Sequence, residues 1–410
     1  MQEKIMNTNC CIAGGGPAGM MTGFLLARAG IDVIVLEKHA DFFRDFRGDT
    51  IHPSTFQLIH ELGLLDEFLK IPHSEILEIA GLFNNQFIKM ADFSHLRVAK
   101  PAIGLMPQWD FLNFLLRQAN RYPGFHAIMR TEVTDLIKEN GKVTGIRTET
   151  PDGIVQINAN LVIGADGRHS VVREKAGLKI ITTGVPMDVL WFKLSKKQTD
   201  PKQVFGNFYF GKIMVMLERT DYWQCGYVIA KGGHDKIKER GLQSFHEEIS
   251  TVVPFLKDRV NELKDWEQIR LLSVAIDHLE KWYCDGLLCI GDAAHAMSPV
   301  GGVGINLAVQ DAVAAANILY QSLKENKPVE TRMLKRVQKR RSLPTKFTQR
   351  LQIAMQNTVI SPSLSGSKQK RPPFFMRMVN RWSILRRITG KLIGIGVRAE
   401  HIHTPDIKKL

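Results

Sequence analysis

A glycine motif near the N-terminus lies between an apolar run and a helical stretch. Gly14, Gly16 and Gly19 form the pattern G-x-G-x-x-G, after the run NCCIA and before MMTGFLLARA. The next apolar run, IDVIVL, ends at Glu37, 23 residues after Gly14. An uninterrupted apolar run suits a strand that is covered on both faces. The order of strand, glycine turn, helix and strand therefore predicts a βαβ unit of a parallel sheet.

Each glycine of this motif has a role that suits a dinucleotide. Gly14 allows the tight turn, Gly16 lets the backbone approach a pyrophosphate, and Gly19 lets the helix pack closely on the strand. The free N–H groups and the positive dipole end of the helix, which includes Ala18, favour the phosphate charge. Glu37, followed by Lys38, can accept hydrogen bonds from ribose hydroxyls and disfavours a 2′-phosphate, which indicates FAD or NAD over NADP. The alternative is a glycine turn with a purely structural role.

Composition describes a globular chain of 410 residues, 44% hydrophobic and 23% charged. Fibrous, collagen-like and disordered classes are excluded. The richest apolar stretch is broken by glycines, Arg28 and Asp32, short of the ~18 residues of a spanning helix, and the start MQEKIMNTNCC lacks a signal-peptide pattern. Five cysteines without a C-x-x-C pair support neither a disulfide framework nor a metal site. A cytoplasmic protein is predicted.

The rest of the chain predicts a mixed α/β organisation. WDFLNFLLRQANR has helical spacing, and Asn140-Gly141 and Asp152-Gly153 mark hairpin turns. Alternating aromatic runs between 185 and 231 predict an antiparallel sheet. A helix is expected near 245–256. The apolar run LLCIGDAAH predicts a last buried strand, before the helix NLAVQDAVAAANILYQSL.

Positive charge is concentrated in the last ninety residues. Residues 321–410 hold 21 Lys and Arg against 4 Asp and Glu, whereas residues 1–320 hold 34 against 37. This region is predicted to be helical, with a loop at 360–373. A helical wheel for residues 375–393 places most apolar residues on one side and most basic residues on the other. Arg386 and Ile384 are exceptions to this separation. Such a helix suits an anionic membrane or a cap over a substrate cleft. No recognition motif accompanies the charge, so nucleic acid is not expected.

Two further motifs lie at the carboxyl ends of predicted strands. The first is Gly164-Ala165-Asp166-Gly167-Arg168, and the second is Gly291-Asp292-Ala293-Ala294-His295, followed by Pro299, Gly301, Gly302, Gly304 and Asn306. With the first glycine motif, they span about residues 10–320 in one order. In this the chain resembles the group A flavoprotein monooxygenases, the family of para-hydroxybenzoate hydroxylase, including its ubiquinone-biosynthesis and tetracycline-inactivating branches.

The resemblance implies non-covalently bound FAD. Asp292 would bond the ribityl chain, and the 164–167 turn would lie between FAD and the approach of NAD(P)H. Arg47 matches an arginine that contacts the flavin diphosphate in this family. Arg117 matches a second position beside the cofactor. The full set of expected cofactor residues is Gly14, Gly16, Ala18, Gly19, Glu37, Lys38, Arg47, Arg117, Asp166, Gly167, Gly291, Asp292, Pro299, Gly302, Gly304, Ile305 and Asn306.

The resemblance also supplies the reaction. NAD(P)H, a transient co-substrate, reduces the flavin, O2 adds at C4a, and the flavin C4a-hydroperoxide hydroxylates an aromatic or polycyclic small molecule. No protein nucleophile is required, and no side chain is singled out as catalytic; Pro299, Gly302 and Asn306 would line the reactive flavin edge. A helix N-terminus beginning near Asn306 would stabilise the negative charge of reduced flavin. His295 is expected to have a structural role.

An apolar wall is expected opposite the flavin. Its candidate residues come from the aromatic runs and suit a flat substrate, although packing in the core is the alternative for each: Trp191, Phe208, Phe210, Met216, Trp223 and Tyr227.

The predicted fold class is α/β, with a Rossmann-like FAD-binding domain interleaved with an antiparallel-sheet substrate domain, plus C-terminal helices. The FAD-binding domain comprises 1–75, 106–178 and 286–323, the substrate domain 76–105 and 179–285, and the basic helical region 324–410. Two alternatives to the monooxygenase remain open. One is an FAD-dependent reductase of the geranylgeranyl-reductase kind, and the other is an FAD-holding scaffold whose segment 374–393 contacts the inner face of a membrane.

Overall fold

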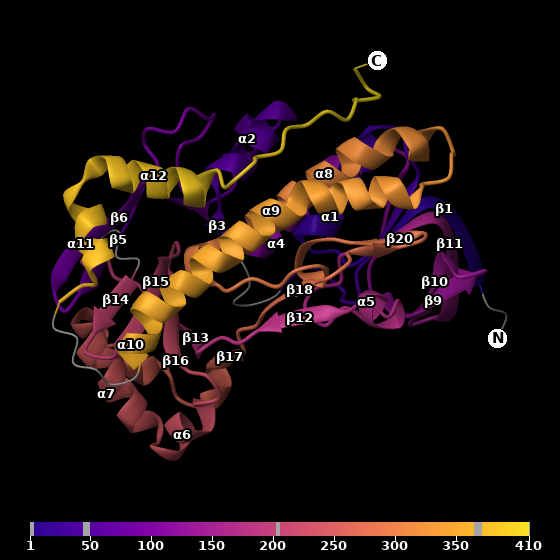
Figure 1. The fold of residues 1–410 in the computed structure, drawn as a ribbon. Coiled ribbons are helices and arrows are strands. Elements are labelled where there is room, and N and C mark those ends of the chain that lie inside the picture. The colour runs from indigo at the N-terminus through magenta and orange to yellow at the C-terminus, as the bar shows by residue number, and fades with distance from the viewer. Residues whose placement is uncertain (1–3, 44–49, 202–205, 365–370, 410) are drawn as a thin grey trace.

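Two large sheets form the framework of the protein, and a long helix runs from one to the other (Figure 1). The structure, a computed structural model, describes residues 4–43, 50–201, 206–364 and 371–409. The first sheet carries the N-terminal glycine motif, and the second contains the aromatic runs. This arrangement confirms the predicted α/β fold class.

The first sheet has β1 near its centre. β1 pairs in parallel with β11 on one side and β2 on the other, so the chain reverses its direction of progress at β1. A crevice outside the carboxyl ends of the strands forms at such a point in an α/β sheet. The strands of this sheet, in the order of the main path and then the antiparallel extension, are β19 (Tyr283–Cys284), β20 (Leu287–Cys289), β11 (Gly153–Gly164), β1 (Lys4–Ala13), β2 (Val33–Leu36), β8 (Phe125–Ile128), β10 (Lys142–Thr150) and β9 (Glu132–Glu139).

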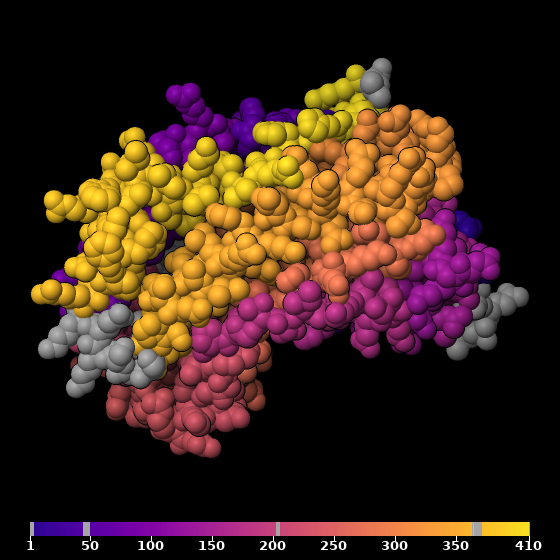
Figure 2. Space-filling view, in the orientation of Figure 1, coloured from indigo at the N-terminus to yellow at the C-terminus, as the bar shows by residue number. Residues whose placement is uncertain are grey.

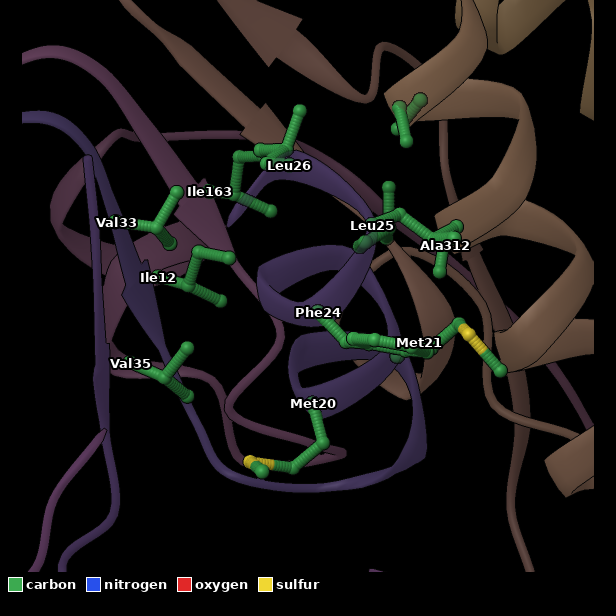
Figure 3. Close-up of a cluster of buried hydrophobic side chains, with 14 of the residues drawn as sticks. Ile12, Met20, Met21, Phe24, Leu25, Leu26, Val33, Val35, Ile163 and Ala312 are labelled. Atoms are coloured by element: carbon green, nitrogen blue, oxygen red, sulfur yellow. The ribbon is translucent and has the colours of Figure 1, made fainter. Parts of the chain in front are cut away.

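Apolar side chains hold helix α1 (Pro17–Arg28) between this sheet and helix α8 (Gly304–Lys324). Figure 3 shows Ile12 of β1 and Ile163 of β11 beside α1, with Ala312 of α8 on the other side. The helix predicted for WDFLNFLLRQANR is α4 (Gln108–Ala119), and it also packs on α1. Helix α8 is apolar and long enough to cross a membrane, but 78% of its most apolar window is buried, as in a core helix.

The second sheet is mainly antiparallel and confirms the predicted sheet of aromatic runs. Its order is β17 (Arg270–Leu272), β13 (Met187–Ser195), β16 (Tyr222–Ala230), β15 (Lys212–Glu218), β14 (Gly206–Tyr209), β5 (Glu78–Phe83) and β6 (Gln86–Asp92). Helices α6 (His234–Glu239) and α7 (Leu242–Val252) cover one face. A two-stranded ribbon pairs β12 (Ile180–Thr183) with β18 (Ile276–Leu279). A three-stranded sheet has the order β3 (Thr50–Ile51), β7 (Ile103–Leu105) and β4 (Ser74–Ile76). The remaining short helices are α2 (Pro53–Glu61), α3 (Leu65–Phe68) and α5 (Val171–Lys175).

Helix α9 (Thr331–Met355) crosses from the end of α8 to the second sheet (Figure 1). It continues into a π-helix, Gln356–Ile360, and then into α10 (Ser361–Leu364). The prediction of a loop from residue 360 was therefore wrong at its start. Ser361 and Pro362, which suggested a loop, instead continue the helical path after the π-helix, and Ser361 has helical φ and ψ.

The basic segment 375–393 is not one helix. It comprises α11 (Phe374–Arg381) and α12 (Ser383–Gly394), which meet at Trp382 in an extended conformation. Met376 and Val379 are buried, with Met376 packed beside Phe83 and Ile88. The break changes which residues share a side, so Phe375 and Trp382 are exposed although the wheel grouped them with Val379.

The last residues return to the first half of the molecule as an extended strap, residues 398–409 (Figure 1). Arg28 of α1 donates to the Thr404 carbonyl oxygen at 2.7 Å and lies 3.5 Å from the Asp406 carboxylate. The Ile407 N–H donates back to the Arg28 carbonyl oxygen at 3.0 Å. The C-terminus is thus part of the packing around α1.

Candidate functional site

The first glycine motif forms a tight turn with an open side. Gly14 has φ +104°, and a Cβ there would overlap the Ala165 carbonyl oxygen at the end of β11. A Cβ at Gly19 would overlap the Gly14 carbonyl oxygen. Gly16 differs, because a Cβ there would meet no described atom within 4 Å beyond its own chain neighbours. The N-terminus of α1 therefore opens onto free space, where phosphate oxygens can reach its N–H groups.

Glu37 follows β2 and turns toward this loop. Its Oε2 accepts from the Gly15 N–H at 3.2 Å, and its Oε1 accepts from the His39 N–H at 3.1 Å. The carboxylate thus lies beside the glycine turn, as the ribose-binding prediction requires. Lys38 is exposed and pairs with Glu132 at 3.7 Å, so its side chain points to solvent.

Gly291 joins the first and third motifs. A Cβ at Gly291 would lie 3.0 Å from the Ala18 Cβ and 3.5 Å from the Ala308 Cβ. Ala18 belongs to the first turn of α1 and Ala308 to the second turn of α8. The two helix N-termini therefore lie side by side, separated by one backbone segment. Asp292 follows Gly291 in a 3₁₀ turn, Gly291–Ala293, and is half-buried.

The start of α8, like that of α1, follows a turn that needs glycine. Gly301 and Gly302 have φ of +80° and +63°, which turns the chain into the helix, and α8 has no side-chain N-cap. The Gly302 carbonyl oxygen accepts from Thr50 Oγ1 at 2.6 Å. A Cβ at Gly304 would meet no described atom within 4 Å beyond its helix and chain neighbours. This second helix N-terminus is also open.

Asn306 in the first turn of α8 is held by hydroxyl groups that sequence reasoning missed. Its Oδ1 accepts from Ser54 Oγ at 2.6 Å and from Thr55 Oγ1 at 3.0 Å. Both hydroxyls come from the N-terminus of α2 and are buried. These bonds orient the amide with its oxygen toward α2. The signal was the short polar run after His52, which carries no motif of its own.

The second motif forms a turn after β11. Asp166 Oδ2 accepts from the Val172 N–H at 3.1 Å, at the start of α5. Its Oδ1 is buried and has no hydrogen-bond partner among the described residues. Burial raises the pKa of this carboxyl group. Gly167 has φ +86° and open space beside it. Arg168 and Arg173 do not extend into that space: Arg168 donates to the Ser273 carbonyl and Arg173 to the Ala293 carbonyl.

Together these features fit an extended dinucleotide. Gly16 and Gly304 mark two open helix N-termini. Near the first of them, Glu37 supplies carboxylate oxygens as acceptors. Asp166 adds a buried oxygen that has no hydrogen-bond partner among the described residues. Helix N-termini favour groups that carry or develop negative charge. The arrangement suits a pyrophosphate at α1 and a ring that becomes anionic on reduction at α8.

Three glutamines hold the loop that precedes α8. Gln352 Nε2 donates to the carbonyl oxygens of Ser298 at 2.9 Å and Val300 at 2.8 Å, and Ser298 N–H donates to Gln352 Oε1 at 3.2 Å. Gln356 donates to Ser298 Oγ at 2.7 Å, and Gln349 to the Ala296 carbonyl at 3.0 Å. Their spacing of three and four residues puts them on one helix face. Buried glutamines at helical spacing were the signal that sequence reasoning missed.

His295 has a structural environment, as expected. It is buried, and its Nε2 lies 2.5 Å from Asp311 Oδ2. Asp311 Oδ1 accepts from Arg341 Nε at 2.9 Å, and Arg341 pairs with Glu400 of the strap at 3.3 Å. Burial raises the pKa of Asp311, but His295 and Arg341 outweigh it and lower the pKa. The network connects α8, α9 and the C-terminal strap.

The six predicted wall residues do not all lie on one face of the second sheet. Leu190 pairs with Tyr227, while Trp191 pairs with Gly226, so neighbours alternate between faces. Tyr227 bonds Glu248 of α7 at 2.6 Å. Two clusters result: Met216, Trp223 and Tyr227 pack under α6 and α7, whereas Trp191 and Phe208 pack with Val300 on the other face.

The remaining predicted residues have mixed placements. Phe210 is 49% exposed, in the turn between β14 and β15. Arg117 is exposed on α4, with its guanidinium 5.9 Å from the Phe114 ring centroid. Pro299 precedes a 3₁₀ turn and accepts from the Gly302 N–H at 3.0 Å, and Ile305 is buried. Arg47 lies outside the described residues.

The sheet order, the two open helix N-termini and Glu37 define a dinucleotide-binding oxidoreductase of the flavoprotein type. The model of an FAD-binding domain family matches residues 7–350. The chain belongs to this family and, within it, to the FAD-dependent monooxygenases of group A.

The relatives agree with this assignment. The chain is 32% identical over 392 residues, 93% of its length and 92% of the other, to 6-methylpretetramide 4-monooxygenase of Streptomyces rimosus. It is 25% identical over 336 residues, 78% and 79% of the two lengths, to para-nitrophenol 4-monooxygenase of a Pseudomonas species. An anhydrotetracycline hydroxylase of Streptomyces rimosus has the same fold, with a TM-score of 0.75 and 19% identity over 96% of this chain and 77% of that one.

Proposed function

We propose that this FAD-dependent monooxygenase hydroxylates a polycyclic aromatic compound, with NAD(P)H as electron donor and O2 as co-substrate. The relative with 32% identity over nearly the whole chain is named for such a substrate, 6-methylpretetramide. This similarity is the single observation that carries the proposal, and the close packing of Gly291 between Ala18 of α1 and Ala308 of α8 supports the binding of FAD.

FAD, when bound, supplies the transfer of electrons from NAD(P)H to O2 and the insertion of one oxygen atom into the substrate. The chain's own groups bind and orient it. The N-terminus of α1 would hold the pyrophosphate, Glu37 would bind the ribose hydroxyls, and the N-terminus of α8 would stabilise negative charge at the ring edge. Asp292 would bond the ribityl chain and Asp166 would lie at the approach of NAD(P)H. The cofactor residues named from sequence, Arg47 and Arg117 included, belong to this proposal.

The loop Ser298–Val300 and the apolar face with Trp191 and Phe208 are proposed to enclose the substrate. Val300 packs with Val189 and Val228 of the second sheet, so the loop lies against that face. An apolar wall favours a flat ring system and excludes water. We place the FAD-binding and substrate domains at the boundaries given above.

Substrate screening tests the proposal. Purified holoenzyme is incubated with single-ring phenols, quinone precursors and tetracyclic aromatics, and NAD(P)H consumption is followed in isotopically labelled O2. The expected result is stimulation by a fused-ring compound, with a product that contains one labelled oxygen atom. Stimulation by single-ring phenols alone would contradict the substrate class.

A reductase remains the second candidate. One relative, 26% identical over 82% of the chain, is named digeranylgeranylglycerophospholipid reductase 2, from Methanothermobacter thermautotrophicus. Such an enzyme would transfer hydride to a substrate double bond without O2. Turnover of NAD(P)H under anaerobic conditions with an isoprenoid acceptor would favour it, whereas strict dependence on O2 supports the hydroxylase.

We propose a cytoplasmic location with peripheral contact through 374–393. Support comes from the basic excess of the C-terminal region and the exposed apolar residues of α11 and α12. An FAD-holding scaffold without activity would show the same contact but no NAD(P)H oxidation with any aromatic compound.

A further inference from the structure

A long stretch of the chain carries no carboxylate side chain. Between Glu330 and Glu400 the sequence has 17 Lys and Arg and no Asp or Glu. The stretch includes α9, α11 and α12, which are separate elements in the fold. Because charges of one sign repel and lower stability, this composition calls for an anionic partner rather than for packing alone.

Helix α9 presents its basic residues outward. The exposed positions follow helical spacing and include Lys335, Arg336, Lys339, Lys346 and Arg350. Leu343 and Phe347 are 55% and 41% exposed in the same stripe. The opposite side of α9 carries the buried Arg341, Gln349 and Gln352, which are engaged with the rest of the fold. The outward stripe is thus unrelated to the glutamine contacts.

Helices α11 and α12 expose the same mixture. Phe374 is 69% exposed, Phe375 58%, Trp382 49%, Ile384 66% and Ile388 51%. The exposed basic residues among them are Arg377, Arg381, Arg387 and Lys391. Met376 already packs beside Phe83 and Ile88 of the second sheet, and the Lys89 N–H donates to Asn380 Oδ1 at 2.9 Å. The five large apolar side chains are therefore in excess of what the contact between α11 and the second sheet needs.

The two surfaces lie on one face of the molecule. Figure 2 shows α9 in orange and α11 and α12 in yellow, spread over the side that faces the viewer. We call the exposed residues of these three helices the basic platform. Helix α9 alone has 25 residues, which extends the platform over roughly 37 Å at about 1.5 Å per residue.

The chemistry of the platform selects among partners. A second copy would bring the same exposed Lys and Arg side chains against this face, so self-association through it is repelled. Nucleic acid matches the charge but gives no reason for Ile384 and Ile388 to be exposed. Aromatic and aliphatic side chains interspersed with Lys and Arg are typical of surfaces that enter the headgroup layer of an anionic bilayer.

We propose that the basic platform binds the surface of a membrane rich in anionic phospholipid, with α9 and α11–α12 acting together. Arg and Lys side chains contact headgroup phosphates, and Phe374, Phe375, Trp382, Ile384 and Ile388 enter the boundary with the acyl chains. The proposal extends the contact beyond 374–393 to α9, and it does not depend on which compound the enzyme hydroxylates.

Vesicle flotation with the full-length FAD-loaded protein tests the proposal. The probes are vesicles of phosphatidylcholine alone and of equimolar phosphatidylcholine and phosphatidylglycerol. We expect flotation with the anionic vesicles and weakening as salt is raised. Changing Arg377, Arg381, Arg387 and Lys391 to Gln should lower the partition coefficient by roughly a hundredfold or more, because each basic side chain near an anionic surface contributes severalfold.

A second variant tests α9 separately, with Lys335, Arg336, Lys339 and Lys346 changed to Gln, and should give a loss of similar size. The matched control changes four exposed lysines beside α6 and α7 to Gln: Lys236, Lys238, Lys257 and Lys264. The control should float as the parent does. Retained FAD and an unchanged basal rate of NAD(P)H oxidation show that each variant is folded.

Insertion has its own signature. Lipids brominated in the acyl chains should quench the fluorescence of Trp382, and Trp382→Phe should remove that quenching. Equal losses in the control variant, equal binding to neutral vesicles, or binding to an RNA oligonucleotide or polyglutamate without binding to anionic vesicles would each overturn the proposal. Loss from α11–α12 alone, with α9 silent, would overturn the joint platform.

Discussion

Buried polar and charged side chains have specific partners both around the first sheet and around the second sheet. In the first half, Asn306 is fixed by two hydroxyls and Asp311 by an imidazole and a guanidinium. In the second half, Asp200 accepts from Arg259 at 2.6 Å and from Trp223 Nε1 at 2.8 Å. Buried charges of this kind are tolerated because each has specific partners, so removing one partner is costly.

Asp200 gives a prediction at this scale. Burial raises its pKa, but Arg259, the Lys197 N–H and Trp223 outweigh this and lower the pKa from 3.8 to about 2. A lowered folded-state pKa contributes stability above the unfolded pKa, and this is lost as the pH falls through about 4 toward 2. Asp200→Asn should therefore lower the free energy of unfolding by about 2 kcal/mol at neutral pH.

Urea unfolding of the parent and variant at neutral pH and near pH 3 checks this prediction. The difference between them should shrink at the lower pH. Asp221→Asn is the control, because Asp221 is exposed and its carboxylate is not part of this cluster. A variant that lost the same stability at both pH values would show that packing, and not the charge, is responsible.

At the scale of elements, α9 links the first sheet to the loop before α8. Gln352 donates to the Ser298 and Val300 carbonyl oxygens of that loop. Helix α9 then changes to a π-helix at Gln356–Ile360. π-helices are rare and occur often at functional sites. We interpret the glutamines as positioning residues for the Ser298–Val300 loop.

Gln352→Glu should misplace this loop. The change keeps the shape and the acceptor, but it puts negative charge 2.8 Å and 2.9 Å from two carbonyl oxygens. We expect lower kcat and more hydrogen peroxide formed per NAD(P)H, with FAD affinity little changed. The matched control is Gln338→Glu on the same helix, where the amide bonds the Glu280 carbonyl at 2.9 Å and the Trp282 N–H at 3.2 Å. Equal peroxide formation in both variants would refute the positioning role.

The elements were predictable to different degrees. The glycine turn, α4 and α8 followed from local periodicity and from glycines at positive φ, so sequence revealed them. The division of the aromatic strands between two faces depends on register, which places Tyr227 opposite Leu190. The break at Trp382 likewise depends on how Met376 and Val379 meet the second sheet. Neither is encoded locally.

For the site, sequence supplied the backbone positions better than the side chains that support them. Gly16, Gly291 and Glu37 were predicted and lie together, whereas Thr50, Ser54 and Gln352 were missed. The reason is physical: a glycine turn has a fixed spacing, while a supporting hydroxyl can come from any element that the fold brings near. The aromatic wall stays a prediction, because aromatic residues serve cores and pockets equally.

At the scale of the whole molecule, the C-terminal strap closes the fold. It supplies Asp406 to Arg28 and Glu400 to Arg341, and both arginines are buried. Deleting residues 398–410 removes Thr404, Pro405 and Asp406 from Arg28 and leaves Arg341 with Asp311 but without Glu400. Exposing or unpairing these buried charges should cost about 3 kcal/mol or more. The expected result is a clear fall in the thermal unfolding temperature of the holoenzyme.

Deletion of residues 408–410 is the control for that truncation, since it keeps Glu400 and Asp406. It should unfold at the temperature of the parent. If the longer truncation also matched the parent, the strap would be peripheral to the fold.

The central claim is that FAD extends along the open N-termini of α1 and α8, and the flavin content of three purified variants tests it most directly. Gly16→Val and Gly304→Val add side chains where the described structure has free space, so the fold should remain and FAD should be lost. Gly184→Val, equally open but between β12 and β13, should stay yellow with about one FAD per chain. Full flavin content in the first two variants would contradict the account.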